Sequence, residues 1–131
     1  MSSNTLPSGL LVVLSAPSGA GKTTVCGQTL ARNPNMVRAV TCTTRQPRAG
    51  ERDRVDYWFL SEEEFQKRVQ AGEFLEHAEV YGYHYGTLKS EVLDHLNQGR
   101  DVLLAVDVQG AATIRSEVGK VPAMDRALVT V

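Results

Sequence analysis

A short glycine-rich stretch near the amino terminus has the residue types that bind phosphate. Gly19 and Gly21 leave backbone N–H groups open to an anion, and Lys22 and Thr23 follow closely. A lysine at this spacing reaches the β- and γ-phosphates of a nucleoside triphosphate, and the next hydroxyl holds Mg²⁺. An apolar run precedes the glycines and a helix is predicted after them, whose N-terminus adds partial positive charge. The stretch therefore predicts a phosphate loop; a glycine-rich turn with an incidental lysine is the alternative.

The first position of this loop departs from the usual pattern, which begins with glycine. Ala16 stands there instead, where the preceding strand leaves the sheet, and it adds only a methyl group before the anion-binding glycines. We therefore expect the loop to bind phosphate. We assign to it Ala16, Pro17, Ser18, Gly19, Ala20, Gly21, Lys22, Thr23 and Thr24.

A carboxylate is predicted at the edge of the sheet that leads into this loop. Asp107 ends the apolar run 101–107, which is typical of a parallel strand buried on both faces. Ligands of open α/β sheets bind beyond the carboxyl ends of such strands, where an acid can hold Mg²⁺ directly or through water. Capping of the helix predicted at 109–117 is the alternative role, and both roles can hold together.

Two arginines could bind an anion from a polar, proline-containing loop. Arg45 and Arg48 stand three residues apart, and Glu51 follows close enough to orient one of them. Planar guanidinium groups suit bidentate contacts with phosphate. A solvated charged loop is the alternative, and the neighbouring Arg52 and Arg54 fit that description.

These residues are carried by a regular succession of strands and helices. The spacing indicates an α/β domain with a parallel sheet. A capping box of Ser61 and Glu64 starts one helix, whose apolar stripe is Phe65 and Val69. Strands are predicted at 10–15, 37–43, 57–60, 74–80, 101–107 and 126–131, and helices at 22–32, from Ser61 to Gly72, from Thr87 or Ser90 to Gly99, and at 109–117.

The middle of the chain differs in composition from the rest. Residues 41–99 are polar and aromatic with short predicted strands, so we expect a small lobe there. Residues 1–40 would carry the core with the phosphate loop, and residues 100–131 would continue the core.

Composition limits the classes of protein to which the chain can belong. Its 131 residues suit one domain, and 42% of them are hydrophobic, which is enough for a core. A net charge of −1 argues against a general nucleic-acid binder. Cys26 and Cys42 form no C-x-x-C pair and are interpreted as reduced core thiols. No apolar run would span a membrane, and no basic residue precedes the first one, so a soluble cytoplasmic protein is expected.

Five stretches taken together resemble the guanylate kinases. They are SAPSGAGKTT, TCTTRQPRAGE, DYWF, GEFLEHAEVYGYHYGT and DVQGA, and the match covers almost all of 10–114 in order. The resemblance implies transfer of the γ-phosphoryl group of ATP to GMP, giving ADP and GDP, with Mg²⁺. It also implies a parallel-sheet core of the phosphate-loop NTPase type, an inserted α+β lobe that binds GMP, and a mobile lid. The implied partners are these nucleotides, with no nucleic acid and no membrane.

The resemblance also implies site residues. Guanine contacts are expected at Thr41 and Glu76, and Lys22, Arg45 and Arg48 are expected to be catalytic. Core packing is the alternative for the two tyrosines in the set. The implied GMP site consists of Thr41, Arg45, Arg48, Glu51, Tyr57, Glu76, Tyr85, Gly86, Thr87 and Asp107.

Glu76 is the most informative of these residues. In the alternating stretch 74–80 it shares an otherwise apolar face with Phe74, Ala78 and Val80. A buried carboxylate needs a partner. Guanine offers two adjacent donors, N1–H and the 2-amino group, whereas adenine would leave the acid unpaired. A salt bridge within the lobe is the alternative.

Two departures from the family pattern bear on activity. The family usually has a second acid two residues before the one matched by Asp107, and Ala105 stands in that place. The chain also ends inside the strand predicted at 126–131, before the lid and the adenine-contacting segment that the family carries. We therefore expect a piece of a longer protein that is a poor catalyst as given.

Two other functions fit parts of the sequence. A guanylate-kinase-like module that binds protein partners would keep the fold, but such modules typically lose parts of the phosphate loop, which is complete here. A related phosphate-loop kinase with another phosphorylated acceptor would keep the loop, but Glu76 and Thr41 favour guanine.

Overall fold

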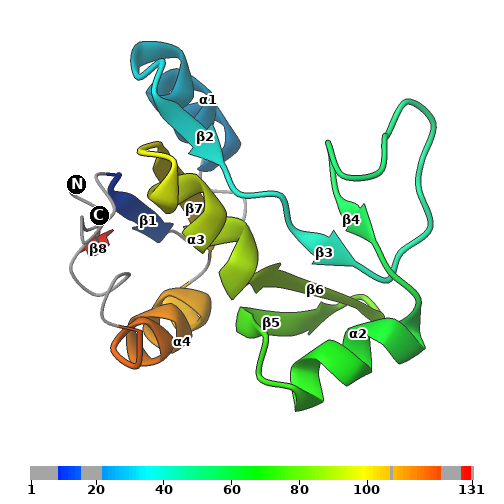
Figure 1. Ribbon diagram of the computed structural model, residues 1–131. Coiled ribbons are helices and arrows are strands. Elements are labelled where there is room, and N and C mark those ends of the chain that lie inside the picture. The colour runs from blue at the N-terminus through cyan, green and yellow to red at the C-terminus, as the bar shows by residue number, and fades with distance from the viewer. Residues whose placement is uncertain (1–8, 16–21, 107, 122–127, 131) are drawn as a thin grey trace. The chain divides into compact units, whose positions relative to one another are not determined.

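A computed structural model describes residues 9–15, 22–106, 108–121 and 128–130 of the chain. Strands and helices alternate along these residues, as the sequence predicts (Figure 1). In chain order the elements are β1 Leu11–Ser15, α1 Lys22–Arg32, β2 Met36–Arg38, β3 Cys42–Thr43, β4 Trp58–Phe59, α2 Glu62–Gln70, β5 Phe74–Val80, β6 Tyr83–Leu88, α3 Lys89–Asn97, β7 Asp101–Val106, α4 Val108–Val118 and β8 Leu128–Thr130.

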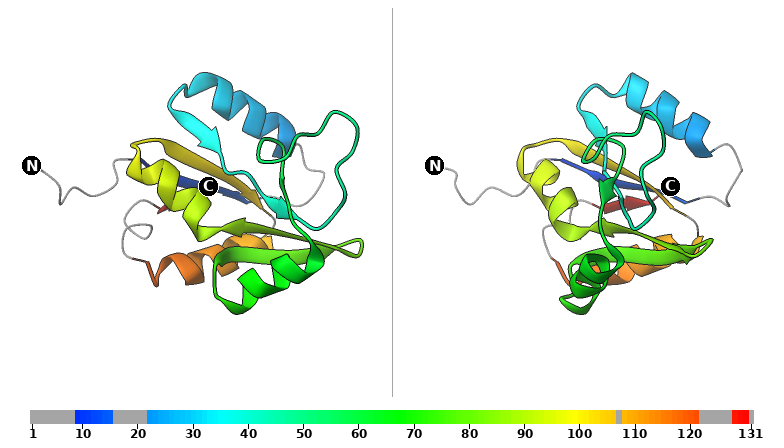
Figure 2. Two further views of the ribbon diagram at one scale, coloured as in Figure 1. Left: turned by 45° about the vertical axis from the view of Figure 1, so that its right-hand side comes forward. Right: turned by 90° about the vertical axis from the view of Figure 1, so that its right-hand side faces the viewer.

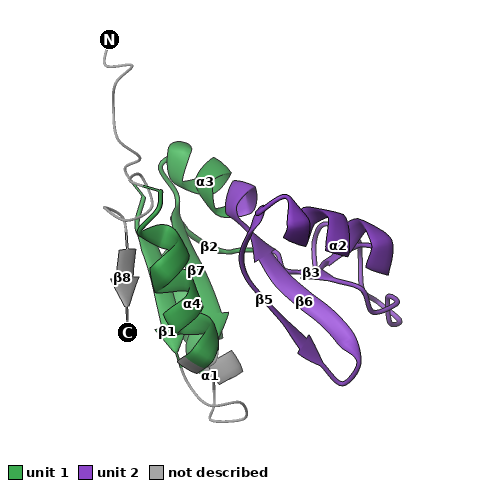
Figure 3. Cartoon of the chain, turned by 90° about the horizontal axis from the view of Figure 1, so that it is seen from below, with its two compact units in different colours: residues 1–39, 92–131 green, residues 40–91 purple. Residues whose placement is uncertain are grey.

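The chain divides into two compact units (Figure 3). Unit 1 comprises residues 1–39 and 92–131, and unit 2 comprises residues 40–91. The second boundary falls inside α3, whereas the sequence placed the end of the lobe at residue 99. The reason is packing, because Val92 and Leu96, the buried residues of α3, belong to unit 1.

Unit 1 is built on a parallel sheet with the strand order β2-β7-β1-β8. β1 and β7 are its central strands, in register from Leu11 opposite Val102 to Ser15 opposite Val106. Leu11 and Val13 of β1 and Val102 of β7 are fully buried. Helices α1 and α4 lie on opposite faces of this sheet (Figure 2), which explains why its central strands are apolar on both sides. The predicted fold class is confirmed.

The single strand predicted at 37–43 is wrong. β2 pairs with β7 in unit 1, whereas β3 pairs with β4 and β6 in unit 2. The two strands belong to different sheets because the chain passes from one unit to the other between them. An apolar run shows that a segment is extended, but it does not show which partner strand each half will find.

Unit 2 has a four-stranded sheet with the order β4-β3-β6-β5, and β6 was not predicted. The sequence allowed a helix to start at Thr87, but β6 continues to Leu88 and α3 begins at Lys89. β5 and β6 form a hairpin whose two-residue turn is Tyr81 and Gly82, with φ of 51° and 83°. Such turns usually carry Asn, Asp or Gly at the first position, so a tyrosine there conceals the signal.

Helix α2 covers one face of the unit 2 sheet, as Figure 3 shows. Its start is as predicted, because the Ser61 hydroxyl accepts a hydrogen bond from the Glu64 N–H at 3.0 Å. Phe65 is fully buried and stacks on Phe74 with the ring centroids 4.6 Å apart. Cys42 belongs to the same cluster, and its burial raises the pKa of the thiol to about 12. Cys42 is therefore a core residue, as the sequence suggests.

None of the helices that the structure describes is long and apolar enough to cross a membrane.

Candidate functional site

A β-bulge in β5 decides which side chains share a face of the unit 2 sheet. Phe74 pairs with Leu88 and Glu76 pairs with Thr87, so Leu75 is the extra residue. The strict alternation predicted for 74–80 is therefore wrong, and Glu76 does not share a face with Phe74. Instead Phe74 lies near His77, with the ring centroids 5.9 Å apart.

The face opposite α2 carries three of the predicted site residues, Glu76, Tyr85 and Thr87, and we call it the site face. Residues that pair across antiparallel strands project on the same side of the sheet. Glu76 pairs with Thr87, and Tyr85 pairs with both Ala78 and Thr43. These five residues therefore share one face. Glu76 is half-buried there, and Ala78 is exposed, so this face is not the apolar core face that the sequence indicated.

Gly86 faces the other side of the sheet, toward the α2 core. A Cβ atom on Gly86 would lie 2.8 Å from the Phe74 ring, so the ring explains the glycine at this position. Its predicted contact with a ligand stays a prediction.

Arg45 and Glu51 form the best-defined ion pair of the predicted site. Nη1 and Nη2 of Arg45 donate to the two carboxylate oxygens of Glu51, at 2.9 and 3.0 Å. Nη1 also donates to the carbonyl oxygen of Gln46 at 3.0 Å. Only 6% of the Arg45 side chain is exposed, although arginines are rarely buried without partners. Glu51 is thus the partner that lets a buried guanidinium keep its charge.

Both partners titrate far from their usual ranges. The pKa of Glu51 is lowered to about 2, first by the hydrogen bonds from Arg45 and then by the N–H of Arg48. The pKa of Arg45 is raised, first by Glu51 and then by the Tyr85 hydroxyl, with a smaller effect of the Tyr57 hydroxyl. The pair is therefore fully ionised at neutral pH.

Acid titration should reveal the Glu51 ion pair. Because the folded-state pKa of Glu51 lies below its usual value of 4.5, its contribution to stability is complete above about pH 4.5 and is lost as the pH falls toward 2. The wild-type chain should therefore melt at a higher temperature than Glu51→Gln at pH 7, and the difference should shrink below pH 4.5. Glu63→Gln is the matched control, because the Glu63 side chain is 84% exposed. A difference that stays constant down to pH 3 would contradict this prediction.

Two aromatic rings complete the Arg45 cluster. The guanidinium carbon of Arg45 lies 5.2 Å from the centroid of the Tyr57 ring, in a cation–π arrangement. Tyr57 in turn meets Tyr85 edge-on, with the centroids 6.1 Å apart. Strand β6 supplies Tyr85, and the turn before β4 supplies Tyr57. The structure thus brings together Arg45, Glu51, Tyr57 and Tyr85, which come from three separate segments, and we call them the Arg45 cluster.

Arg48 joins this cluster through its backbone. Its N–H donates to Glu51 Oε1 at 2.8 Å, and its carbonyl accepts the Glu51 N–H at 3.0 Å. The Arg48 residue is exposed. One carboxylate therefore fixes the side chain of Arg45 and the backbone of Arg48.

Sequence reasoning missed Thr43 and Thr44, which hold the start of this loop. Thr43 is fully buried, and its hydroxyl accepts a hydrogen bond from the Arg45 N–H at 3.2 Å. The Thr44 hydroxyl accepts the His84 N–H at 2.9 Å and so ties the loop to β6. The available signal was the run of hydroxyl residues directly before Arg45, a type that commonly bonds to nearby backbone.

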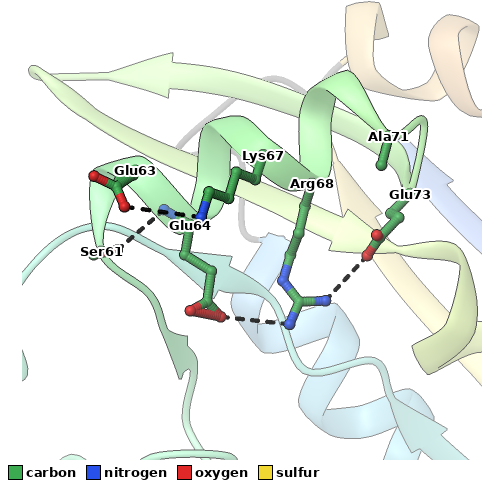
Figure 4. A pocket seen from close by; sticks show the side chains of 7 residues that line it. All are labelled: Ser61, Glu63, Glu64, Lys67, Arg68, Ala71 and Glu73. Carbon is green, nitrogen blue, oxygen red and sulfur yellow. Dashed lines mark hydrogen bonds and ion pairs between the residues drawn. The ribbon is translucent and has the colours of Figure 1, made fainter.

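An open pocket along α2 is separate from the predicted site residues (Figure 4). Arg68 crosses it, pairing with Glu64 at 3.4 Å and with Glu73 at 3.1 Å. These charged side chains pair with one another through the Nη atoms of Arg68, whereas Arg68 Nε is buried without a hydrogen-bond partner. The pocket is lined by Ser61, Glu63, Glu64, Lys67, Arg68, Ala71 and Glu73.

The family model described as guanylate kinase matches residues 8–123. The chain belongs to the guanylate kinase family. The resemblance seen in the sequence is thereby confirmed.

Guanylate kinases from several bacteria are close relatives. The guanylate kinase of Thermotoga maritima is 52% identical over 109 residues, which cover 83% of this chain and 53% of the relative. That of Symbiobacterium thermophilum is 50% identical over 111 residues, which cover 85% of this chain and 53% of the relative. The chain thus spans about half the length of the curated relatives it matches.

A solved guanylate kinase has the same fold. The crystal structure of guanylate kinase from Anaplasma phagocytophilum superposes with a TM-score of 0.67 at 36% sequence identity. The match covers 95% of this chain and 60% of that one.

Part of the guanylate kinase pattern lies outside the described residues. The loop residues 16–21 and Asp107 are not described, while Lys22, Thr23 and Thr24 open helix α1. In unit 2, Thr41 accepts the Trp58 N–H through its carbonyl at 2.9 Å, beside β3. Across the described part of the chain, no group of three or more His, Cys, Asp or Glu residues is placed to hold a metal ion.

Proposed function

We propose that this chain provides the acceptor site and the phosphate loop of a guanylate kinase, which transfers the γ-phosphoryl group of ATP to GMP. The Arg45 cluster carries the proposal. It combines a buried guanidinium, two tyrosines and a fixing carboxylate, and Tyr85 shares the site face with Glu76. An arginine fork with phenolic donors suits a phosphate dianion.

The base of the acceptor is recognised by different residues. In this proposal Glu76 accepts the N1–H and the 2-amino group of guanine, with Thr41 as a second contact. Support comes from the site face, where Glu76 stands half-buried opposite Thr87 and two residues from Ala78, the partner of Tyr85. In this arrangement the Glu76 carboxylate would recognise the base of GMP, and the Arg45 cluster would bind its phosphate.

The donor nucleotide is proposed to bind at the phosphate loop. The loop amides and Lys22 would hold the β- and γ-phosphates of ATP at the N-terminus of α1, where helical N–H groups favour an anion. Thr23 and Asp107 are the residues proposed to hold Mg²⁺. When bound, Mg²⁺ neutralises charge on the phosphates of ATP.

The proposed reaction needs no protein nucleophile. A phosphate oxygen of GMP attacks the γ-phosphorus of ATP in line with the leaving ADP, so catalysis is positioning and charge neutralisation. Arg45 and Arg48 would reduce the repulsion between two anionic nucleotides. In this proposal the chain works on free nucleotides in the cytoplasm, in purine metabolism and the recycling of GMP.

Nucleotide binding by the chain tests this proposal. Calorimetry should detect binding of both GMP and ATP to the wild-type chain. The Lys22→Ala variant should no longer bind ATP but should still bind GMP, because in this proposal the lysine contacts only the phosphates of the donor. Lys120→Ala is the matched control, since Lys120 pairs with Glu117 outside the site. Absence of binding by both nucleotides would contradict the proposal and favour a protein-binding module. A coupled assay of GMP-dependent ADP formation then measures how much turnover these residues support.

A further inference from the structure

The hydrogen bonds of Arg45 are distributed unevenly around its guanidinium group. Nη1 uses both of its hydrogens, on Glu51 Oε1 at 2.9 Å and on the Gln46 carbonyl at 3.0 Å. Nη2 uses one hydrogen on Glu51 Oε2 at 3.0 Å. These bonds leave Nε–H and the second hydrogen of Nη2 for a ligand and for the hydroxyls of Tyr85 and Tyr57, which also hydrogen-bond to the Arg45 side chain. Because the guanidinium is planar, these two N–H groups point in parallel from one edge.

That edge of Arg45 is the one suited to a second anion. The cluster already places the Tyr57 ring 5.2 Å from the guanidinium carbon, and Tyr57 meets Tyr85 edge-on. Two parallel N–H groups match two oxygens of a phosphate, as they match a carboxylate. The guanidinium thus has one edge that binds Glu51, and one edge, beside the hydroxyls of Tyr85 and Tyr57, that can bind a ligand together with them.

We propose that Glu51 is a positioning residue that turns the Nε edge of Arg45 toward the acceptor phosphate and sets the backbone of Arg48 beside it. This inference rests on the proposed function and adds the device that orients its phosphate site. Glu51 itself touches no phosphate, because both of its oxygens are bonded to Arg45 and one also accepts the Arg48 N–H.

Holding Arg45 in this orientation has a cost that its ion pair with Glu51 offsets. An arginine side chain has many rotamers, and holding one of them costs conformational entropy. The bidentate pair fixes the group before the ligand arrives, so the ligand does not have to order it. Glu51→Gln keeps the size of the side chain but can accept on only one atom. Arg45 then loses the parallel pair and its fixed orientation, while its charge remains.

Ligands that differ by the phosphate separate this role from general stabilisation. The probes are GMP, guanosine and inorganic phosphate, titrated into the wild-type chain, Glu51→Gln and the control Glu73→Gln. Glu73 also forms an ion pair with an arginine, Arg68, at 3.1 Å and outside the cluster. We expect Glu51→Gln to lower the affinity for GMP and for inorganic phosphate by about tenfold. The affinity for guanosine should stay within about twofold of the wild-type value. Glu73→Gln should change none of the three.

Three outcomes would overturn the inference. Equal weakening of GMP and guanosine would make Glu51 a structural residue only. Unchanged GMP binding by a folded Glu51→Gln variant would remove any role in phosphate recognition. Tighter GMP binding would mean that Glu51 competes with the phosphate for Arg45. Failure of the proposed function is distinguishable, because the wild-type chain would then bind neither GMP nor guanosine.

A double-mutant cycle keeps the test decisive if Glu51→Gln is destabilised. Arg45→Lys retains the charge but has no planar edge to orient. In that background Glu51→Gln should cause little further loss of GMP affinity, because the group it positions is gone. Additive losses would contradict the inference.

Discussion

Arg45→Ala should lower the affinity for GMP by roughly 10²-fold or more, because two charge-assisted hydrogen bonds to the phosphate are removed. The same change leaves the carboxylate of Glu51 without its main partner, so the melting temperature should fall as well. Arg45→Lys should bind GMP almost as weakly as Arg45→Ala, because the lysine ammonium keeps the charge but cannot donate two parallel N–H hydrogen bonds. Titration of GMP by calorimetry measures all three chains.

Guanosine and a neighbouring arginine serve as controls for this prediction. Guanosine binding should change much less than GMP binding in Arg45→Ala, since the nucleoside lacks the phosphate. Arg52→Ala should bind GMP like the wild-type chain, because Arg52 is exposed in the same loop and bonds to Asp56 through its backbone, its N–H donating at 2.7 Å and its carbonyl accepting at 3.0 Å. GMP affinity within threefold of wild type in Arg45→Ala would remove the cluster from the acceptor site.

Glu76→Ala should chiefly relax the preference for guanine. The wild-type carboxylate matches two donors of guanine that adenine does not present, and such mismatches are worth up to about 10⁴-fold. We therefore expect the ratio of GMP to AMP affinity to fall steeply in the variant, largely through weaker GMP binding. Competition titrations with the two nucleotides give this ratio directly.

The hairpin itself offers the matched control for Glu76. Glu79→Ala removes a carboxylate from the same strand, but Glu79 is 63% exposed and lies near His84, at 3.8 Å. The GMP to AMP ratio should be unchanged in that variant. An unchanged ratio in Glu76→Ala would show that Glu76 serves a salt bridge within the lobe and not the base.

The sequence predicted the core well because its signals are local. Continuous apolar runs located β1 and β7, and the glycine stretch before Lys22 located the start of α1. The capping residue Ser61 located α2. Each of these signals depends on residues within one turn or one strand, so no knowledge of distant partners was needed.

The lobe was harder because its decisive features are not local. The bulge at Leu75 moves Glu76 to the face opposite Phe74, and a pattern of alternating residues cannot reveal an inserted one. The sequence joins β3 to β2 because only the pairing of β3 with β4 and β6 sets it apart. The sequence gives no sign of β6 because the turn before it has Tyr81 at a position that is usually Asn, Asp or Gly, so the hairpin is not evident.

The site residues were found by type, and their arrangement came from the fold. Two arginines and an acid in one loop suggested an oriented guanidinium, but nothing in the spacing indicated that Arg45 would be the buried one. That choice follows from Thr43, whose buried hydroxyl holds the Arg45 N–H, and from Tyr57, which packs on the guanidinium. Arg48, three residues later, is exposed.

A crystal structure of this chain with GMP tests the central claim most directly. The account predicts the phosphate on the Nε edge of Arg45, with the hydroxyls of Tyr57 and Tyr85 donating to it and the Arg45–Glu51 pair intact. It predicts the guanine base against the carboxylate of Glu76. A phosphate bound away from Arg45, or a base that does not meet Glu76, would contradict the assignment of this face as the acceptor site.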